Sequence, residues 1–310
     1  MKAVICSKYG PPEVLQFREI KKPFPKDNEV LIKTKATTVH IGDTKIRRFA
    51  PGMGPVRDFF FKPVMRFMIG FTGPRKKILG MELAGDIEAV GKHVRRYKVG
   101  DAVFASTGFN FGAYAEYCCL PEEAIMAIKP SNMTYEQAAP VSNGALTALI
   151  FLRKAKVQKG HRVLIYGASG SAGTYAVQLA KYFGAEVTGV CSTSNLEMVR
   201  SIGADRVIDY MKEDFTQSGD LYNVIFDAVG KVPGSKRKTA LTKEGVYLDI
   251  LGLSGNTKLI VEDLNFLKEL CEQGHLKSVI DRTYSFDQIV EAHRYVDQGH
   301  KKGNVVVTVP

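Results

Sequence analysis

One stretch decides the fold: Val163-Leu164-Ile165-Tyr166-Gly167-Ala168-Ser169-Gly170-Ser171-Ala172-Gly173. It begins as a short apolar run, typical of a buried parallel strand, and continues into a turn of small residues with glycines spaced G-x-x-G-x-x-G. The apolar periodicity that follows predicts a helix with Gly184 at its C-cap, and its buried face comprises Ala176, Val177, Leu179, Ala180 and Phe183. Small side chains let a pyrophosphate approach the backbone, where the free amides and the positive dipole end of the helix hold it. The predicted phosphate-binding residues are Gly167, Ser169, Gly170, Ser171, Ala172 and Gly173; the alternative is a glycine-rich turn without a ligand.

A second buried run, 187–191, is followed by Ser192, Thr193, Ser194 and Asn195. In a dinucleotide-binding fold this strand end faces the adenosine ribose, about 20 residues past the glycine turn, and NAD binders place Asp or Glu there. A carboxylate would repel a 2′-phosphate, so hydroxyls and an amide at these positions predict NADPH as the cofactor. The alternative is that Ser194 only caps the next helix, in a capping box with Glu197, and the two roles can coexist.

From about residue 135 the chain alternates helices and strands, which predicts a parallel sheet with right-handed crossovers. The predicted strands are 163–166, 187–191, 206–208, 224–226 and 246–251. Residues 1–125 are rich in short strands and glycine turns and show no long helical periodicity, which is typical of β structure. Beyond residue 261 we expect a helix, a strand near 279, a second helix that begins at a capping box (285–288), and a last strand over 304–309.

The length, composition and net charge of the chain limit the class of protein to which it can belong. The chain has 310 residues, 45% of them hydrophobic, which is enough for two domains with real cores. No signal segment and no membrane span are predicted, and five cysteines without a C-x-x-C pair favour a reducing cytoplasm, so we expect a cytoplasmic location without stable membrane insertion. The net charge of +11 is typical of nucleic-acid or anionic-membrane contact, but the basic residues form short groups without interleaved aromatics. We therefore favour a solvated basic surface that draws in an anionic cofactor, and expect no nucleic-acid partner.

The chain resembles the zinc-less medium-chain dehydrogenases/reductases of the quinone-oxidoreductase branch over nearly its whole length. The motifs that carry the resemblance, besides the glycine turn, are 80–85 (GMELAG), 99–103 (VGDAV), 112–117 (GAYAEY), 146–148 (LTA), 203–205 (GAD), 207–210 (VIDY) and 302–306 (KGNVV). The resemblance implies an α/β fold in which a Rossmann dinucleotide-binding domain is inserted into a GroES-like β-rich catalytic domain. The implied domains are 1–125 (GroES-like), 126–258 (Rossmann) and 259–310 (return to the catalytic domain), with the active cleft between the two.

The same resemblance predicts that no metal is bound. Zinc-dependent relatives place Cys, His and Cys or Asp where this chain has His40, Met81 and Asn143, and a thioether and an amide are poor Zn²⁺ ligands. The four cysteines of the structural zinc lobe are also missing. Without a Lewis acid, the implied chemistry is direct hydride transfer to a polarised conjugated acceptor, a quinone or an enone, whose oxyanion meets hydrogen-bond donors or water.

Further cofactor residues follow from the resemblance. Thr147, Val229 and Gly230 are implied beside the nicotinamide end, with Gly303 and Asn304 closing over it. Tyr210 corresponds to a tyrosine that packs near the 2′-phosphate, whereas Asn195 stands where many relatives carry a lysine for that phosphate, a departure that weakens the NADPH prediction. We also expect Leu251 to contact the cofactor.

The candidate catalytic residues are His40, Asp43 and Asn143, which are expected to line the cleft. His40 and Asp43 lie on the predicted turn where relatives often show Asn-x-x-Asp, and an imidazole there can donate a hydrogen bond or a proton to the substrate. The favoured alternative is a buried histidine held by Asp43. Tyr114 either faces the cleft or packs between the domains.

Two features depart from the family. The stretch 59–71 is apolar and aromatic, with Val64, Phe67, Met68 and Phe71 at helical spacing. We favour core or lid packing for it; the alternatives are a partner face and a basic interfacial helix that touches a membrane. Only about ten residues separate position 251 from the next helix, which puts in doubt the dimerisation that relatives achieve through their last Rossmann strand, so a homodimer stays open.

The leading hypothesis is an NADPH-dependent, zinc-independent reductase of quinones or α,β-unsaturated carbonyls. One alternative is an NADP-linked alcohol or aldehyde dehydrogenase, which the missing zinc ligands disfavour. A second, of a different class, is a non-catalytic protein that senses NADPH and binds nucleic acid through its basic surface.

Overall fold

The structure, a computed structural model, describes residues 1–50, 63–64, 66–250 and 260–310. The chain divides into two compact units. Unit 1 comprises Met1–Asn143, Ile260–Lys268 and Ile280–Pro310, and unit 2 comprises Gly144–Leu259 and Glu269–Val279. The strands of the described residues form three sheets, of two, five and seven strands.

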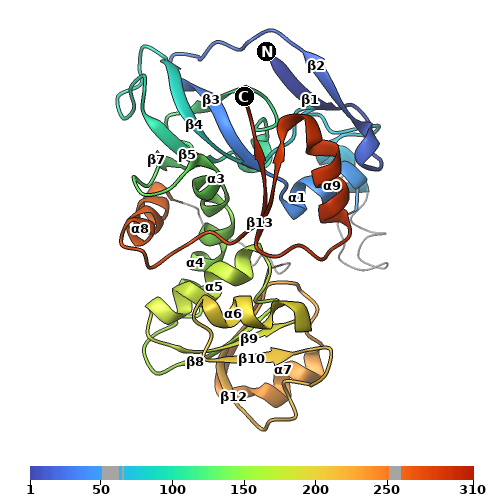
Figure 1. Ribbon diagram of the computed structural model, residues 1–310, viewed down its shortest axis with the longest axis vertical. Helices are drawn as coiled ribbons and strands as arrows, with labels where there is room; N and C mark the ends of the chain where they lie inside the picture. Colours follow the sequence, from blue (N-terminus) through green and yellow to red (C-terminus); the bar gives the residue numbers. More distant parts are fainter. Residues whose placement is uncertain (51–62, 65, 251–259) are drawn as a thin grey trace. The chain divides into compact units, whose positions relative to one another are not determined.

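Unit 1 is built on a mixed sheet in the order β13-β14-β3-β4-β5-β7, with β6 also paired to β3. Its strands are β3 (Glu29–Thr38), β4 (Glu82–Val90), β5 (Ala102–Ser106), β6 (Tyr117–Pro121), β7 (Met126–Ile128), β13 (Ile280–Ser285) and β14 (Asn304–Thr308). A separate antiparallel pair is formed by β1 (Lys2–Cys6) and β2 (Leu15–Glu19). The helices of unit 1 are α1 (Ile41–Arg48), α3 (Tyr135–Ala138) and α9 (Ile289–Asp297), and α9 lies beside α1 (Figure 1).

Two apolar clusters stabilise unit 1. Val30, Ile32 and Leu83 lie in one, between β3, β4 and their neighbours. The other joins both ends of the chain, because Val4 of β1 belongs to the same cluster as Val305 of β14. Burial of this apolar surface is the main stabilising contribution to the unit.

Unit 2 is built on a sheet in the order β10-β9-β8-β11-β12, and every strand pair in it is parallel. Its strands are β8 (Arg162–Tyr166), β9 (Glu186–Cys191), β10 (Arg206–Asp209), β11 (Tyr222–Asp227) and β12 (Leu241–Asp249). The helices are α4 (Gly144–Lys154), α5 (Ser171–Tyr182), α6 (Leu196–Ser201) and α7 (Gly234–Ala240), and the division between the units falls within α8 (Val261–Glu272). The predicted α/β fold with its parallel sheet is confirmed.

The local predictions around the glycine turn are confirmed except at the end of the helix. Helix α5 buries Ala176, Val177, Leu179 and Ala180, but Phe183 is half-buried and is itself the C-cap residue; Gly184, predicted at the C-cap, follows it with a φ of +81°, a conformation in which glycine ends helices. One element was missed: His40 and Asp43 were expected on a turn, but they begin α1, which ends at Phe49 in the left-handed conformation.

Candidate active site

The glycine turn connects β8 to α5, and each of its glycines has a different environment. Gly167 has a φ of +81°, and a Cβ there would lie 2.3 Å from Val229 Cγ2. A Cβ on Gly173 would lie 2.1 Å from the carbonyl oxygen of Gly167, so close packing of helix against strand requires glycine at this position. Gly170 differs from both, because its φ is −81° and a Cβ would meet only Gly167 O, at 3.5 Å.

The first turn of α5 therefore begins at an open position. The backbone amides of Ala172 and Gly173 lie in this turn, where no intrahelical acceptor exists for them. Ser169 precedes Gly170, the N-cap residue, and neither has a bulky side chain to cover the turn. These amides and the helix dipole suit the pyrophosphate of a dinucleotide, as the sequence predicts.

Helix α4 supports the same end of α5. A Cβ on Gly144 would lie 2.6 Å from Ser171 Oγ, which shows how closely α4 approaches the start of α5. Thr147 lies one helical turn after Gly144 and is half-buried. The structure thus brings Thr147 and Ser171 into one region of unit 2; the contact of Thr147 with a nicotinamide stays a prediction.

The end of β9 offers hydroxyls, as expected, but their arrangement corrects one alternative. Ser194 does not cap α6: the N-cap residue is Asn195, and no side chain makes a capping bond there. The Asn195 Nδ2 donates instead to Ser192 Oγ, at 3.1 Å. Ser194 is exposed, so its hydroxyl faces solvent rather than the helix.

A carboxylate does lie at this strand end, supplied by the neighbouring strand. Asp209 of β10 pairs with Cys191 of β9, and its Oδ2 accepts from Thr193 Oγ1 at 2.6 Å. Its Oδ1 accepts from the Met211 amide at 3.0 Å, so both oxygens already serve the protein. Tyr210, next in the chain, is 52% exposed and free to pack against a nucleotide.

The turn after β11 is organised by Asp227, a residue that the sequence analysis missed. Its Oδ1 accepts from the amides of Val229 (3.0 Å) and Gly230 (2.7 Å), and Tyr247 donates to its Oδ2 at 2.9 Å. Because β11 neighbours β8, this turn lies next to the glycine turn, in agreement with the contact between Gly167 and Val229. The sequence did contain a signal for Asp227, because a charged residue there ends an apolar strand.

Unit 1 holds the candidate catalytic residues. His40 is the N-cap residue of α1, and its Nδ1 accepts from the Gly42 amide at 3.0 Å. Burial, together with the charges of Lys301 and Lys45, lowers the pKa of His40 to about 4. The imidazole is therefore neutral at pH 7, and because Nδ1 is an acceptor, the proton is on Nε2.

Asp43 is the second residue of the capping box at the start of α1. Its Oδ2 accepts from the backbone amide of His40 at 3.3 Å, and its Oδ1 accepts from the Gly80 amide at 2.9 Å. Burial raises its pKa to about 7. Asp43 does hold His40, as the favoured alternative predicted, but through the backbone amide of His40 rather than through its imidazole, and His40 is only partly buried.

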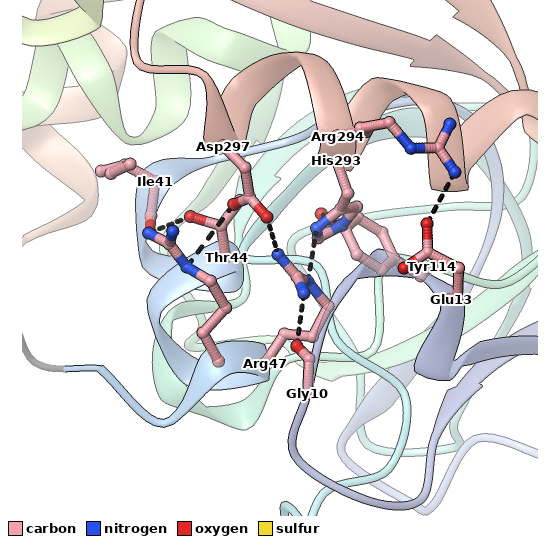
Figure 2. Close-up of polar contacts among 10 residues, drawn as sticks. Gly10, Glu13, Ile41, Thr44, Arg47, Tyr114, His293, Arg294 and Asp297 are labelled. Atoms are coloured by element: carbon pink, nitrogen blue, oxygen red, sulfur yellow. Dashed lines mark hydrogen bonds and ion pairs between the residues drawn. The ribbon is translucent and has the colours of Figure 1, made fainter.

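Arg47, one turn after Asp43 on α1, is the centre of a buried polar network (Figure 2). The Arg47 guanidinium donates to Gly10 O (2.5 Å), to His293 Nδ1 (3.3 Å) and to the Asp297 carboxylate. His293 Nε2 bonds the Tyr114 hydroxyl at 3.1 Å, and burial lowers the pKa of His293 to about 3. Tyr114 is fully buried within unit 1 in this network, so both alternatives predicted for it, a cleft-facing or an interdomain side chain, were wrong.

Met81 and Asn143 stand at the positions where the resemblance predicts zinc ligands in zinc-dependent relatives. Met81 Sδ would lie 2.6 Å from a Cβ on Gly42, so the thioether is beside the His40 turn. Asn143 follows the 3₁₀ turn Ala139–Ser142, and its Nδ2 is buried without a hydrogen-bond partner. In the part of the chain that the structure describes, no group of three His, Cys, Asp or Glu residues could hold a metal ion.

Glu82 and Lys301 are two further charged residues near His40 that the sequence analysis did not select. Glu82 is 1% exposed, and burial raises its pKa to about 8. Burial lowers the pKa of Lys301 to about 8, and its charge acts on both Glu82 and His40. A glutamate in an apolar strand was the available signal for Glu82, whereas nothing local distinguished Lys301 among 43 basic residues.

Some predicted residues are not tested by this geometry. Leu251 lies outside the described residues. Gly303 and Asn304 belong to unit 1, at the start of β14, and the other cofactor candidates belong to unit 2, so their closure over a cofactor stays a prediction.

The apolar stretch 59–71 is described only in part, at 63–64 and from 66 onward. Residues 63–64 and 66–69 are helical, and the four apolar side chains at helical spacing are between 51% and 70% exposed: Val64, Phe67, Met68 and Phe71. Core packing of these four side chains is therefore wrong. Among the described helices, none is long and apolar enough to cross a membrane, and all five cysteines are free.

Comparison with known proteins covers both units. Residues 26–130 match the alcohol dehydrogenase GroES-like domain, and residues 202–307 match the zinc-binding dehydrogenase family. The chain is 32% identical to a 2-methylene-furan-3-one reductase of Solanum lycopersicum (99% of this chain, 79% of the relative). It is 31% identical to a chloroplastic NADPH-dependent alkenal/one oxidoreductase of Arabidopsis thaliana, with the same coverage. A solved quinone oxidoreductase from Coxiella burnetii superposes with a TM-score of 0.82 at 27% identity, covering 100% of this chain and 99% of the other.

Proposed function

Because this chain belongs to the quinone-oxidoreductase branch of the medium-chain dehydrogenases/reductases, we propose that it transfers a hydride from NADPH to a quinone or an α,β-unsaturated carbonyl without zinc. The names of the relatives support the cofactor and both acceptor classes. The cytoplasmic location and a homodimer remain predictions, and one of these relatives is named as chloroplastic.

The residues of unit 2 fit a dinucleotide. The open position at Gly170 and the first-turn amides of α5 would hold the pyrophosphate. Ser192 and Ser194 offer hydroxyls to the adenosine 2′-phosphate, while both oxygens of Asp209 are already occupied. When bound, NADPH supplies the hydride.

The observation that carries the reaction class is the protonation state of His40. Its Nδ1 is held by the Gly42 amide, so the neutral ring presents Nε2–H as a donor. As hydride adds to a conjugated acceptor, an electron pair moves onto the carbonyl oxygen, and a fixed donor at that oxygen lowers the barrier. We infer that His40 Nε2–H meets this oxyanion, a task that a Lewis-acidic metal performs in zinc-dependent dehydrogenases.

Zinc independence rests on the donor set rather than on the family description. Of the three positions that hold ligands in zinc-dependent relatives, only His40 carries a good Zn²⁺ ligand, and its Nδ1 is engaged by α1. Met81 and Asn143 supply a thioether and an amide.

The test is an oxidation screen of NADPH and NADH against quinones, enones and aldehydes, with and without a strong chelator. We expect turnover with quinones or enones, unchanged by the chelator. The His40→Ser variant keeps an N-cap for α1 but removes the imidazole, so it should fold normally and lose about 10²–10³-fold in kcat. Turnover with aldehydes alone would favour the dehydrogenase, and salt-dependent nucleic-acid binding without any turnover would favour the sensor.

A further inference from the structure

Three strand ends of the mixed sheet meet where Glu82 and Lys301 lie. Val306 of β14 pairs with Thr38 at the end of β3, and Leu83 of β4 pairs with Thr37. The amino ends of β14 and β4 therefore lie at the carboxyl end of β3. This is also where α1 begins, so the chain from Lys301 into β14 passes the same edge of the sheet as His40.

The Lys301 side chain is fixed at this edge. Its Nζ donates to Gly303 O at 2.6 Å, and the adjoining amide of Lys302 donates to Asp281 of β13 at 2.9 Å. An ammonium has three donors, so two remain after the Gly303 bond. Within the described ranges of the chain, no carboxylate forms an ion pair with Lys301.

The carboxyl that faces Lys301 is also only partly satisfied. Glu82 Oε1 accepts from the Thr38 hydroxyl, while Oε2 is buried without a hydrogen-bond partner. A buried carboxyl and a partly buried ammonium that do not pair directly are costly, and such arrangements are found at functional sites. The charged groups that act on Lys301 are Glu82 from β4 and Asp281 from β13, and Lys301 in turn acts on His40 at the start of α1.

We propose that Lys301 is the proton donor of the reaction, and that Glu82 is a positioning residue that holds the Lys301 ammonium at the acceptor oxygen. This inference rests on the proposed function. The hydride adds to the β-carbon of an enone, the C=C electron pair moves toward the carbonyl, and the oxygen becomes an enolate. One Nζ–H bond of Lys301 then breaks as the enolate O–H bond forms, leaving a neutral amine that regains its proton from solvent. With a quinone, the same proton completes the hydroquinone.

The position of this amine suits the role. Burial lowers the pKa of Lys301 to about 8, so the side chain is charged at pH 7 and yet releases its proton far more readily than an ordinary lysine. The Glu82 carboxylate raises the pKa of Lys301, and because the pKa of Glu82 is itself about 8, this effect grows as the pH rises through 8. His40, whose own pKa is too low for it to carry a spare proton at pH 7, remains a neutral hydrogen-bond donor beside it.

The decisive variant is Lys301→Arg. Arginine keeps the positive charge and can still donate a hydrogen bond to Gly303 O, but it does not release a proton at neutral pH. We expect on the order of a 10²-fold or greater loss in kcat with little change in KM or in NADPH affinity. Lys302→Arg, at the neighbouring position, is the matched control and should keep parental kcat. A purely structural role for Lys301 predicts parental kcat for both variants, and that result would overturn the proposal.

A second measurement does not depend on turnover. Lysines of the cofactor-free protein are methylated with ¹³C-formaldehyde and titrated by NMR, and the resonance missing from Lys301→Arg is assigned to Lys301. We expect it to titrate near 8 in the parent and at a lower pH in Glu82→Gln, where the carboxylate charge is gone. Titration like an exposed lysine, or no change in Glu82→Gln, would contradict the proposal. If neither quinones nor enones support oxidation of NADPH by the parent, the proposed function fails, and the titration still reports separately on the Lys301–Glu82 coupling.

Discussion

Replacement of Gly170 by valine separates cofactor binding from folding. Gly170 is the N-cap residue of α5, with φ −81° and ψ 178°, an extended conformation that valine adopts without strain. A Cβ would meet only Gly167 O, at an ordinary contact distance of 3.5 Å. The space around Gly170 is therefore open.

The expected effect on binding is large. The valine methyl groups would project in front of the first-turn amides, such as those of Ala172 and Gly173, which the pyrophosphate needs. Each charge-assisted hydrogen bond contributes about 1.5–3 kcal/mol. Loss of two such bonds costs about 3 kcal/mol or more, which corresponds to at least about a 100-fold increase in Kd. The effect on stability is small, because replacing glycine by valine at an N-cap costs roughly 1 kcal/mol of unfolding free energy.

Fluorescence titration with NADPH measures the first effect, and thermal melting measures the second. Gly173→Ala is the control with the opposite behaviour: its Cβ would lie 2.1 Å from Gly167 O, so it should lower the melting temperature strongly. A Gly170→Val protein that melts within a few degrees of the parent and binds NADPH with parental Kd would show that this turn does not bind the pyrophosphate. The functional proposal that depends on it would then fail.

Four further predictions concern the charge of the site, the buried network and metal. Ser192→Asp should reverse the preference for NADPH over NADH, because a carboxylate at the end of β9 repels the 2′-phosphate; equal Kd values for both cofactors in the parent would contradict this. Arg47→Met should lower the unfolding free energy by about 3 kcal/mol in denaturant titrations, since it leaves buried acceptors without a donor, whereas Arg48→Met, at an exposed position, should change it by less than about 0.5 kcal/mol. The pKa of His293 is depressed in the folded state, so the stability it contributes is complete above pH 6.5 and is lost as pH falls toward 3, by about 1.4 kcal/mol per pH unit. In melting experiments at a series of pH values, His293→Gln should therefore lose less stability than the parent as the pH falls from 6.5 toward 3. An equal loss in both proteins would show that other groups cause it. Chelation followed by metal analysis should leave activity intact with substoichiometric zinc; one tightly held zinc per chain, with activity lost on its removal, would refute zinc independence.

The fold of unit 2 could be predicted because its signals are local. Strand β8, the glycine turn and α5 are consecutive, and each apolar period matches the element that forms. The hydroxyls after β9 were predicted for the same reason. Asp209 was not, because it reaches that strand end from the next strand, and strand pairing cannot be read from either segment alone.

The candidate catalytic groups depend on contacts between distant residues. Helix α1 was missed because its stability comes from tertiary bonds, including the one between Asp43 and the Gly80 amide, rather than from its short, glycine-containing sequence. Glu82 and Lys301 are more than 200 residues apart, so no spacing rule connects them. Likewise, the spacing of Phe67 and Met68 defines a helical face correctly but does not say whether anything packs against it.

The pairing of β14 with β3 has a consequence for synthesis of the chain on the ribosome. Residues Ala36–Thr38 emerge about 270 residues before their partners in β14, which at 5–20 residues per second is a delay of about 14–54 s. During that time the contiguous sequence of the parallel sheet is complete, while β3 carries an open hydrogen-bonding edge and its apolar neighbours lack Val305 and Val307. Unit 2 is thus free to fold first, whereas the sheet of unit 1 is completed only when β14 has been translated. A chain truncated before β14 should therefore accumulate as an aggregation-prone species whose exposed edge is the carboxyl half of β3.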